Sequence, residues 1–338
     1  MSETIKYQKD EDGIVTLTID IADRSMNVLT PEFMEDLDAA IERVAGDDSA
    51  RGAIVTSAKS SFIAGADLKE LVGVFGQGLD EHQIYEFAGK YSKLYRKLET
   101  CGKPFVAAIN GTALGGGLEL CLACHDRVVL DNPKAAIGLP EVKVGLLPGA
   151  GGTQRLPRLI GIAAGLDLIL TGRSVRPRRA LKMGLVDEIC PKEVLLDVAS
   201  KRARQAIDSP DGDEARMTRV RSWLSPAALQ QLALEENPIG RRVLFSKAEE
   251  KMLEATKGNY PAPPAALRCV KIGVEDGPEA GYAAELAEFG ELVVSPEAKA
   301  LMSVFFASQA LKKDRGIDSK AKARKVSKVG VLGGGHMG

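Results

Sequence analysis

A run of three glycines separates a β-type segment from an apolar helical segment in NGTALGGGLELCLACHDRV, residues 110–128. Glycines that open a helix leave backbone N–H groups exposed, and the helix N-terminus adds unpaired donors and a partial positive charge. A reaction needs such donors when an oxygen atom becomes negative in its transition state. Glu119 follows Gly116 by three residues, which places its carboxylate one helical turn away on the same face. The segment therefore predicts an oxyanion-binding amide beside a carboxylate.

A second carboxylate, Glu141, lies between Pro140 and Val142 in GLPEVKVGLLPGAGGTQRLPRLIG, residues 138–161. Apolar surroundings of this kind raise the pKa of a carboxyl group. Two such carboxyls can divide a reaction between them, one as base and the other as acid. Taken singly, Glu119 is equally well explained as a solvated helix residue, and Glu141 as a capping or salt-bridge residue.

A third segment, SFIAGADLKEL at residues 61–71, predicts a tight turn at Gly65 and a helix that begins near Asp67. Ala66 can offer a second backbone N–H group there, and Lys69 a cation. An ordinary loop in which Asp67 caps the helix explains this segment equally well.

The elements that must position these segments alternate between strands and helices. Short β-branched runs predict strands at 13–20, 51–58, 104–110 and 127–130. Thr30 is suited to cap a helix that begins at Pro31 and ends at Gly46. The alternation predicts an α/β domain over residues 1–191.

Helical patterns continue further along the chain. Thr153 is expected to cap a helix that has Pro157 in its first turn, and Pro177 to begin another that Gly184 ends. Strand patterns then stop. Helical patterns occur around 192–207, 226–256 and 278–310, so residues 192–311 are predicted to form a helical connector.

The last residues change in character twice. Residues 312–327 are basic and poor in apolar side chains, which is typical of a solvated linker. Residues 328–338 place Gly333, Gly335 and Gly338 after a β-type run, in the GxGxxG spacing of a dinucleotide-binding turn. The helix and acidic residue that complete such a motif do not follow, so we expect an incomplete NAD-binding domain, with a glycine-rich tail as the alternative.

The composition limits the classes of function. The 338 residues are 45% hydrophobic and 27% charged with a net charge of −1, which is typical of a globular protein and gives no reason to expect nucleic-acid binding. The sequence contains neither a signal peptide nor an uninterrupted apolar run of eighteen residues, so we do not expect membrane insertion or export. Five scattered cysteines favour a reducing cytoplasm. Cys121, Cys124 and His125 have haem-attachment spacing, but a buried helix explains them better, and no histidine is placed as a metal ligand.

Four segments together resemble the enoyl-CoA hydratase/isomerase (crotonase) family: FIAGADL, NGTALGGGLEL, GLPEVKVGLLPGAGGTQRLPRLIG and GNYPAP. The resemblance covers essentially the whole chain. It implies a crotonase fold, a spiral of repeated ββα units that binds acyl-CoA across loops at one end. By motif, it also implies that Ala66 and Gly116 supply two oxyanion-hole amides and that Glu119 and Glu141 are the catalytic pair.

The implied reaction is addition of water to trans-2-enoyl-CoA in fatty-acid β-oxidation, without a cofactor. The family further implies that Ala64, Asp67 and Lys69 contact CoA, and that isomerase or 3-hydroxyacyl-CoA epimerase activity accompanies hydration through the same enolate. Another crotonase-type isomerase or CoA-ester hydrolase is one alternative, and a non-catalytic acyl-CoA-binding module is another. The presence of both glutamates favours the hydratase.

The order of hydratase-like segment, helical connector and glycine motif is similar to that in α chains of multifunctional fatty-acid oxidation complexes of the anaerobic type. This similarity implies that the intact protein is also an NAD-dependent 3-hydroxyacyl-CoA dehydrogenase, of which the chain holds only the beginning. It also implies a thiolase β chain as partner in an α2β2 assembly.

Overall fold

The computed structural model describes residues 4–76, 81–208, 235–314, 326–328 and 330. The chain divides into two compact units, Met1–Met302 and Ser303–Gly338. In the second unit the described residues are helical as far as Lys313. Most of the predicted linker and the three glycines of the NAD motif, Gly333, Gly335 and Gly338, lie outside the described residues. The boundaries at 191, 311 and 327 remain predictions.

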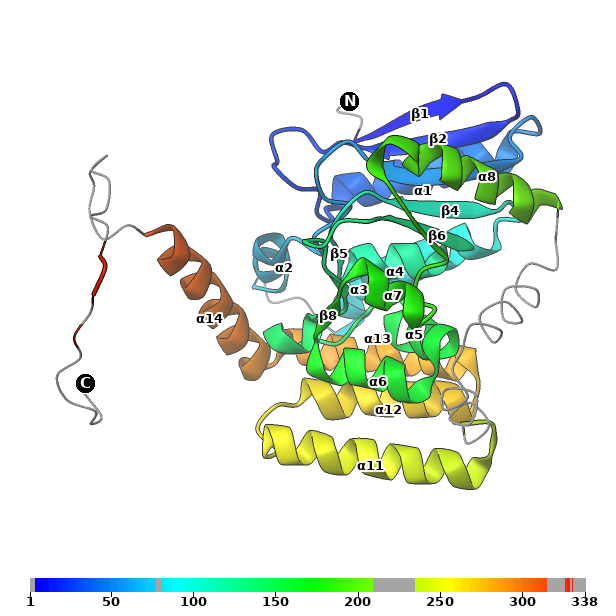
Figure 1. Ribbon diagram of the computed structural model, residues 1–338. Coiled ribbons are helices and arrows are strands. Elements are labelled where there is room, and N and C mark those ends of the chain that lie inside the picture. Colours follow the sequence, from blue (N-terminus) through cyan, green and yellow to red (C-terminus); the bar gives the residue numbers. More distant parts are fainter. Residues whose placement is uncertain (1–3, 77–80, 209–234, 315–325, 329, 331–338) are drawn as a thin grey trace. The chain divides into compact units, whose positions relative to one another are not determined.

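A six-stranded sheet forms the centre of the first unit, with strand order β1-β2-β3-β4-β6-β9 (Figure 1). Its strands are β1 Ile5–Lys9, β2 Ile14–Ile19, β3 Gly52–Ser57, β4 Phe105–Ile109, β6 Asp126–Leu130 and β9 Glu188–Cys190. Strands β1 and β2 are antiparallel and all other neighbours are parallel. Every residue of β3 and β4 is buried, as the continuous apolar runs of parallel strands require. The predicted α/β class is confirmed.

A smaller sheet has the order β5-β7-β8, formed by Ala113–Leu114, Ile137–Gly138 and Ser174–Val175. The helices of the sheet region are α1 Pro31–Gly46, α2 Leu68–Phe75, α3 Glu81–Thr100, α4 Gly116–Ala123, α5 Gly152–Ile160, α6 Ile162–Thr171, α7 Pro177–Lys182 and α8 Leu195–Asp208. Helix α8 packs on β3, β4 and β6 through a core that includes Ile54, Val106, Val128, Ala199 and Ala203.

The C-terminal helices are α11 Pro238–Thr256, α12 Ala262–Glu275, α13 Pro278–Val294 and α14 Pro296–Lys313. Helices α11, α12 and α13 are stacked on the side of α5 and α6 (Figure 1). Small residues allow α12 and α13 to approach closely, since a Cβ built on Gly281 would lie 2.7 Å from the Cα of Gly273. This close packing fixes the position of α13 against the sheet region.

The first helix is as predicted. Helix α1 begins at Pro31, and the Thr30 side chain accepts a hydrogen bond from the Phe33 amide. The helix expected after the glycine-rich run is confirmed as α5, but its predicted start is wrong: it begins at Gly152 after the N-cap residue Gly151, and Pro157 lies inside it beyond the first turn. Thr153 is not the cap because carboxylates from distant segments bind the amides of this turn, a contact that local sequence does not reveal.

The connector also differs from prediction. Helix α12 was not expected, because its first turn contains Pro263 and Pro264, although proline is tolerated there. The single helix expected at 278–310 is two helices, separated at Ser295 and Pro296. The helix expected at 226–256 corresponds in its C-terminal part to α11, which begins at Pro238 and is capped by the Asn237 side chain. Residues 209–234 lie outside the described residues.

Candidate active site

The carboxyl ends of β3 and β4 bring two of the predicted segments together, as expected for neighbouring parallel strands. The Phe62 amide donates to the Thr112 carbonyl at 2.9 Å, and the Leu114 amide donates to the Ile63 carbonyl at 3.0 Å. The Asn110 side chain, which follows β4, also donates to the carbonyls of Ser57 at the end of β3 and of Lys59 in the loop after it. The loop that contains Ala66 is therefore tied to the loop that contains Gly116.

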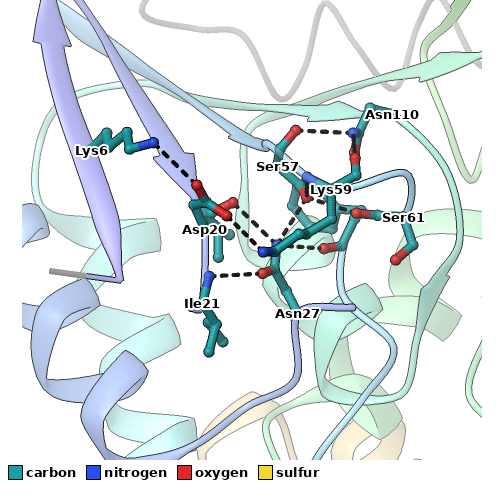
Figure 2. Close-up of polar contacts among 10 residues, drawn as sticks. Lys6, Asp20, Ile21, Asn27, Ser57, Lys59, Ser61 and Asn110 are labelled. Atoms are coloured by element: carbon teal, nitrogen blue, oxygen red, sulfur yellow. Dashed lines mark hydrogen bonds and ion pairs between the residues drawn. The ribbon is translucent and has the colours of Figure 1, made fainter. Parts of the chain in front are cut away.

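Buried Asn27 holds the same loop from its other side (Figure 2). Its Nδ2 donates to the Ser57 hydroxyl at 2.9 Å and to the Phe62 carbonyl at 3.3 Å, and its Oδ1 accepts from the Ile21 amide at 3.1 Å. Its backbone carbonyl accepts from the Ala64 amide at 2.9 Å. One asparagine thus joins the end of β2 to the loop that leads to Ala66.

The amides of Ala66 and Gly116 are both left without hydrogen bonds within the described part of the chain. Leu29 pairs with Ala66 in a parallel bridge that uses the Gly65 carbonyl and the Asp67 amide, so the Ala66 N–H points away from Leu29. Gly116 is the first residue of α4, where no helical acceptor exists for its N–H. A Cβ built on Gly115 would lie 3.6 Å from the Cα of Gly65, so the two turns are in close proximity.

Glu119 is buried on α4, with 3% of its surface exposed. Its Oε1 accepts hydrogen bonds from the amides of Ala150 and Gly152, each at 2.8 Å. Its Oε2 faces Gly116, because a Cβ built on that glycine would lie 3.8 Å from Oε2. One carboxylate oxygen is therefore fixed by the chain, and the other lies near Gly116.

Glu141 begins the 3-10 turn Glu141–Val144, and its side chain approaches Gly115. A Cβ built on Gly115 would lie 2.9 Å from Glu141 Oε1, which explains why a glycine is required at that position. Glu141 Oε2 is buried and has no hydrogen-bond partner among the described residues. A buried oxygen without a hydrogen-bond partner destabilises a folded protein, and such atoms are typical of functional sites.

The surroundings oppose ionisation of both carboxyls. Burial raises the pKa of Glu119, although the Ala150 and Gly152 amides and the charge of Arg155 counteract part of the rise. Burial, followed by the charge of Glu119, raises the pKa of Glu141. Adjacent buried carboxyls of this kind favour a state in which one is ionised and the other protonated. Such a state provides a base and an acid at the same place.

Two further residues reach the site without having been predicted. The hydroxyl of buried Tyr95, on α3, donates to the Gly116 carbonyl at 3.0 Å. Glu285, on α13, is buried close enough to Glu119 and Glu141 for their charges to interact. The sequence does not single out Glu285, which is one of three glutamates in EAGYAAELAEFG, residues 279–290. No local pattern marks Tyr95.

The predicted CoA contacts have structural partners of their own. Asp67 Oδ1 accepts from the amides of Lys69 and Glu70 at the start of α2, and its Oδ2 pairs with Arg24 at 2.6 Å. Asp67 is therefore the helix cap that the sequence allowed as an alternative. Lys69 is exposed near it.

The structure also describes the cysteines, the candidate metal ligands and the apolar character of the helices. Cys121 and Cys124 are buried, as the helix interpretation predicts. Within the described ranges, no group of three or more His, Cys, Asp or Glu side chains is arranged to hold a metal ion. Among the described helices, none has the length and apolar character needed to cross a lipid bilayer.

Comparison with known proteins identifies the family. The model of the enoyl-CoA hydratase/isomerase family matches residues 9–255. The chain belongs to this family. Among its relatives, the fatty acid oxidation complex subunit alpha of Shewanella amazonensis is 43% identical over 339 residues, covering 100% of this chain and 46% of that protein. The subunit alpha of Idiomarina loihiensis is 44% identical, covering 97% of this chain and 44% of that protein. The chain thus spans less than half the length of these relatives.

Solved structures of the family have the same fold. Enoyl-CoA hydratase from Bacillus anthracis is 30% identical with a TM-score of 0.55, covering 79% of this chain and 96% of that one. Human mitochondrial delta3-delta2-enoyl-CoA isomerase, at 22% identity, has a TM-score of 0.61 and covers 92% of this chain and 100% of that one, which supports the fold alone. The predicted crotonase fold is thereby confirmed.

Proposed function

We propose that the chain is an enoyl-CoA hydratase that adds water across the double bond of trans-2-enoyl-CoA in fatty-acid β-oxidation. One observation supports this above all: the carboxyl of buried Glu119 and the buried Oε2 of Glu141 lie beside the amides of Ala66 and Gly116, which have no hydrogen bond among the described residues. The amides would bind the thioester carbonyl oxygen, which becomes negative when a nucleophile attacks the conjugated double bond. Removing one such donor typically lowers the rate by about 10²–10³-fold.

In the proposed mechanism, Glu119 Oε2 accepts a proton from water while the oxygen of that water bonds to the β-carbon. The π electrons of the double bond move to form an enolate, whose oxygen is held by the Ala66 and Gly116 amides. The enolate then collapses, and the α-carbon takes a proton from Glu141. Passage of the first proton from Glu119 to Glu141 restores the starting state, so the net change is addition of one water molecule.

The raised pKa values of the two carboxyls support these roles. Glu119 has its charge partly stabilised by two amides and is suited to be the base. Glu141 has an unpaired buried oxygen and is suited to hold a proton. An isomerase or 3-hydroxyacyl-CoA epimerase activity belongs to the same proposal, because each passes through the same thioester enolate. Ala64, Asp67 and Lys69 are proposed to lie along bound CoA.

The remaining parts of the proposal concern the intact protein. Its relatives are named as α subunits of a fatty acid oxidation complex. We therefore propose a cytoplasmic protein that is also an NAD-dependent 3-hydroxyacyl-CoA dehydrogenase, with Gly333, Gly335 and Gly338 in its NAD-binding turn. A thiolase β chain is the proposed partner in an α2β2 complex. The hydratase itself is proposed to need no cofactor.

The test follows the absorbance of the conjugated thioester of crotonyl-CoA. Glu119→Gln and Glu141→Gln should each lower kcat by about 10²-fold or more, because each removes a proton-transfer group. Binding of butyryl-CoA, measured by calorimetry, should persist in both. Glu250→Gln, an exposed glutamate on α11, is the matched control. If the wild-type chain binds butyryl-CoA but does not hydrate crotonyl-CoA, it is a non-catalytic acyl-CoA-binding module. Equal turnover in all four proteins would exclude these carboxyls from the mechanism.

A further inference from the structure

Two carboxylates share four consecutive amides of the loop that begins α5. The amides of Ala150 and Gly152 donate to Glu119, each at 2.8 Å. The amides of Gly151 and Thr153 donate instead to Glu285, at 2.5 and 3.0 Å. The Thr153 hydroxyl adds a further hydrogen bond to Glu285 Oε2. The loop is therefore held by two carboxylates that bind alternate amides.

These hydrogen bonds replace the side-chain cap that α5 lacks. The first amides of a helix have no partners within it, and Gly151 has no side chain to supply one. The loop cannot easily relax in another way. A Cβ on Gly152 would lie 2.7 Å from Pro148 Cβ and 2.8 Å from Glu119 Oε1, so the backbone is in close contact with its surroundings. Arg155 also donates to the Ala150 carbonyl at 2.8 Å.

Helix α13 brings Glu285 to this loop from the C-terminal helices. Glu285 is 1% exposed, and it is separated from Thr153 by 132 residues of sequence. Gly281, one turn earlier on α13, makes the close contact with Gly273 that seats this helix on α12. The geometry of a proposed catalytic residue on α4 thus depends on a helix outside the sheet region.

We propose that Glu285 is a positioning residue for hydration: by holding the Gly151 and Thr153 amides, it orients those of Ala150 and Gly152 onto Glu119 Oε1 and keeps Oε2 facing the substrate. This inference rests on the proposed hydratase function. Glu285 itself touches neither substrate nor water in this scheme, because its hydrogen-bonded oxygens are directed into the loop. Its position affects the reacting atoms through Glu119, and its charge affects the pKa of Glu141.

The charge of Glu285 gives the proposal a specific signature. The groups that interact with it electrostatically are Glu119 of α4, Glu141, Arg155 of α5, Cys269 of α12 and Tyr282 of its own helix. Burial and the charge of Glu119 contribute most to the raised pKa of Glu141, and the charge of Glu285 adds to it. Neutralising Glu285 should therefore lower the pKa of Glu141 and move the alkaline limb of the kcat profile to lower pH.

The experiment compares the wild-type chain with Glu285→Gln and with Glu291→Gln, an exposed glutamate on the same helix. A misplaced catalytic group can cost about 10²-fold in rate, so we expect kcat of Glu285→Gln to fall by about 10- to 100-fold, with KM for crotonyl-CoA changed less than about threefold. The alkaline limb should move to lower pH. Glu291→Gln should match wild type in all three quantities.

Unchanged kcat in Glu285→Gln would overturn the proposal, as would a loss of kcat with an unshifted pH profile. If Glu285→Gln does not fold, Thr153→Val provides the second test. It removes the hydroxyl that donates to Glu285 while retaining side-chain shape, and it should lower kcat by about fivefold at constant KM through the same displacement. Wild-type kcat in a folded Thr153→Val variant would contradict the proposal. Inactivity of the wild-type chain itself would instead contradict the proposed hydratase function.

Discussion

Glu119 and Arg155 hold the same residue from opposite ends of its backbone: Glu119 Oε1 accepts from the Ala150 amide, and Arg155 Nη1 donates to the Ala150 carbonyl, each at 2.8 Å. Arg155 is buried and also pairs with Glu99 at 3.1 Å. Burial raises the pKa of Glu119, and the charge of Arg155 acts with the Ala150 and Gly152 amides to lower it. Arg155 therefore affects both the position and the protonation of the proposed base.

Replacement of Arg155 by Met should move the acid limb of the kcat profile to higher pH. Without the cation, the pKa of Glu119 rises, and a base is active only when ionised. Breaking a buried ion pair typically costs about 3 kcal/mol or more, so the free energy of unfolding in urea should also fall. Arg179→Met, at an exposed position of α7, is the control. An acid limb that stays in place would disprove the electrostatic role of Arg155.

The stability of the protein should decrease as pH rises above the ordinary carboxyl value. Burial raises the pKa of Glu119, Glu141 and Glu285 above the value of 4.5 expected when the chain is unfolded. At pH values between the unfolded and the folded pKa of such a group, the folded protein binds more protons than the unfolded chain. The free energy of unfolding therefore declines as pH increases. Each such group contributes a slope of at most about 1.4 kcal/mol per pH unit.

The measurement is the free energy of unfolding in urea between roughly pH 5 and pH 8, the range in which carboxyls with raised pKa values titrate. Glu141→Gln removes one of the raised groups and should flatten the decline relative to wild type. Glu250→Gln, which alters an exposed carboxyl, should retain the wild-type slope. Identical slopes in all three proteins would show that Glu141 does not take up a proton on folding.

A methyl group added at Gly117 should lower activity, because it displaces the loop that leads to Ala66. A Cβ on Gly117 would lie 2.6 Å from the Cβ of Ile63 and 2.7 Å from its carbonyl oxygen, so the backbone of that loop must move. Overpacking of this kind typically costs about 1–3 kcal/mol. We expect Gly117→Ala to lose that much stability and at least about tenfold in kcat, because the Ala66 amide is displaced.

Gly46→Ala, at the end of α1, is the matched substitution, since a Cβ there would meet nothing within 4 Å. It should leave kcat unchanged and raise stability by roughly 0.5 kcal/mol through the lower entropy of the unfolded chain. Full activity in Gly117→Ala, measured with crotonyl-CoA, would show that the Ile63 loop adjusts without moving the oxyanion site.

The sequence was sufficient for features that short-range physics decides. Helix α1 was predicted with its first and last residues, because Thr30, Pro31 and the apolar spacing that follows act within a few turns. The four longer parallel strands were predicted from their apolar runs. The relation of Gly116 to Glu119 was also predictable, because both lie on one turn of one helix.

Tertiary structure alone decided how the site is completed. The start of α5 was predicted wrongly because its amides are bound by Glu119 and Glu285, which approach from distant parts of the chain rather than from a neighbouring residue. Helix α12 was missed because its prolines, which usually end helices, lie in the one turn that tolerates them. Sequence periodicity reports which face of an element is apolar, but a hydrogen bond across 132 residues arises only when packing brings the two partners together.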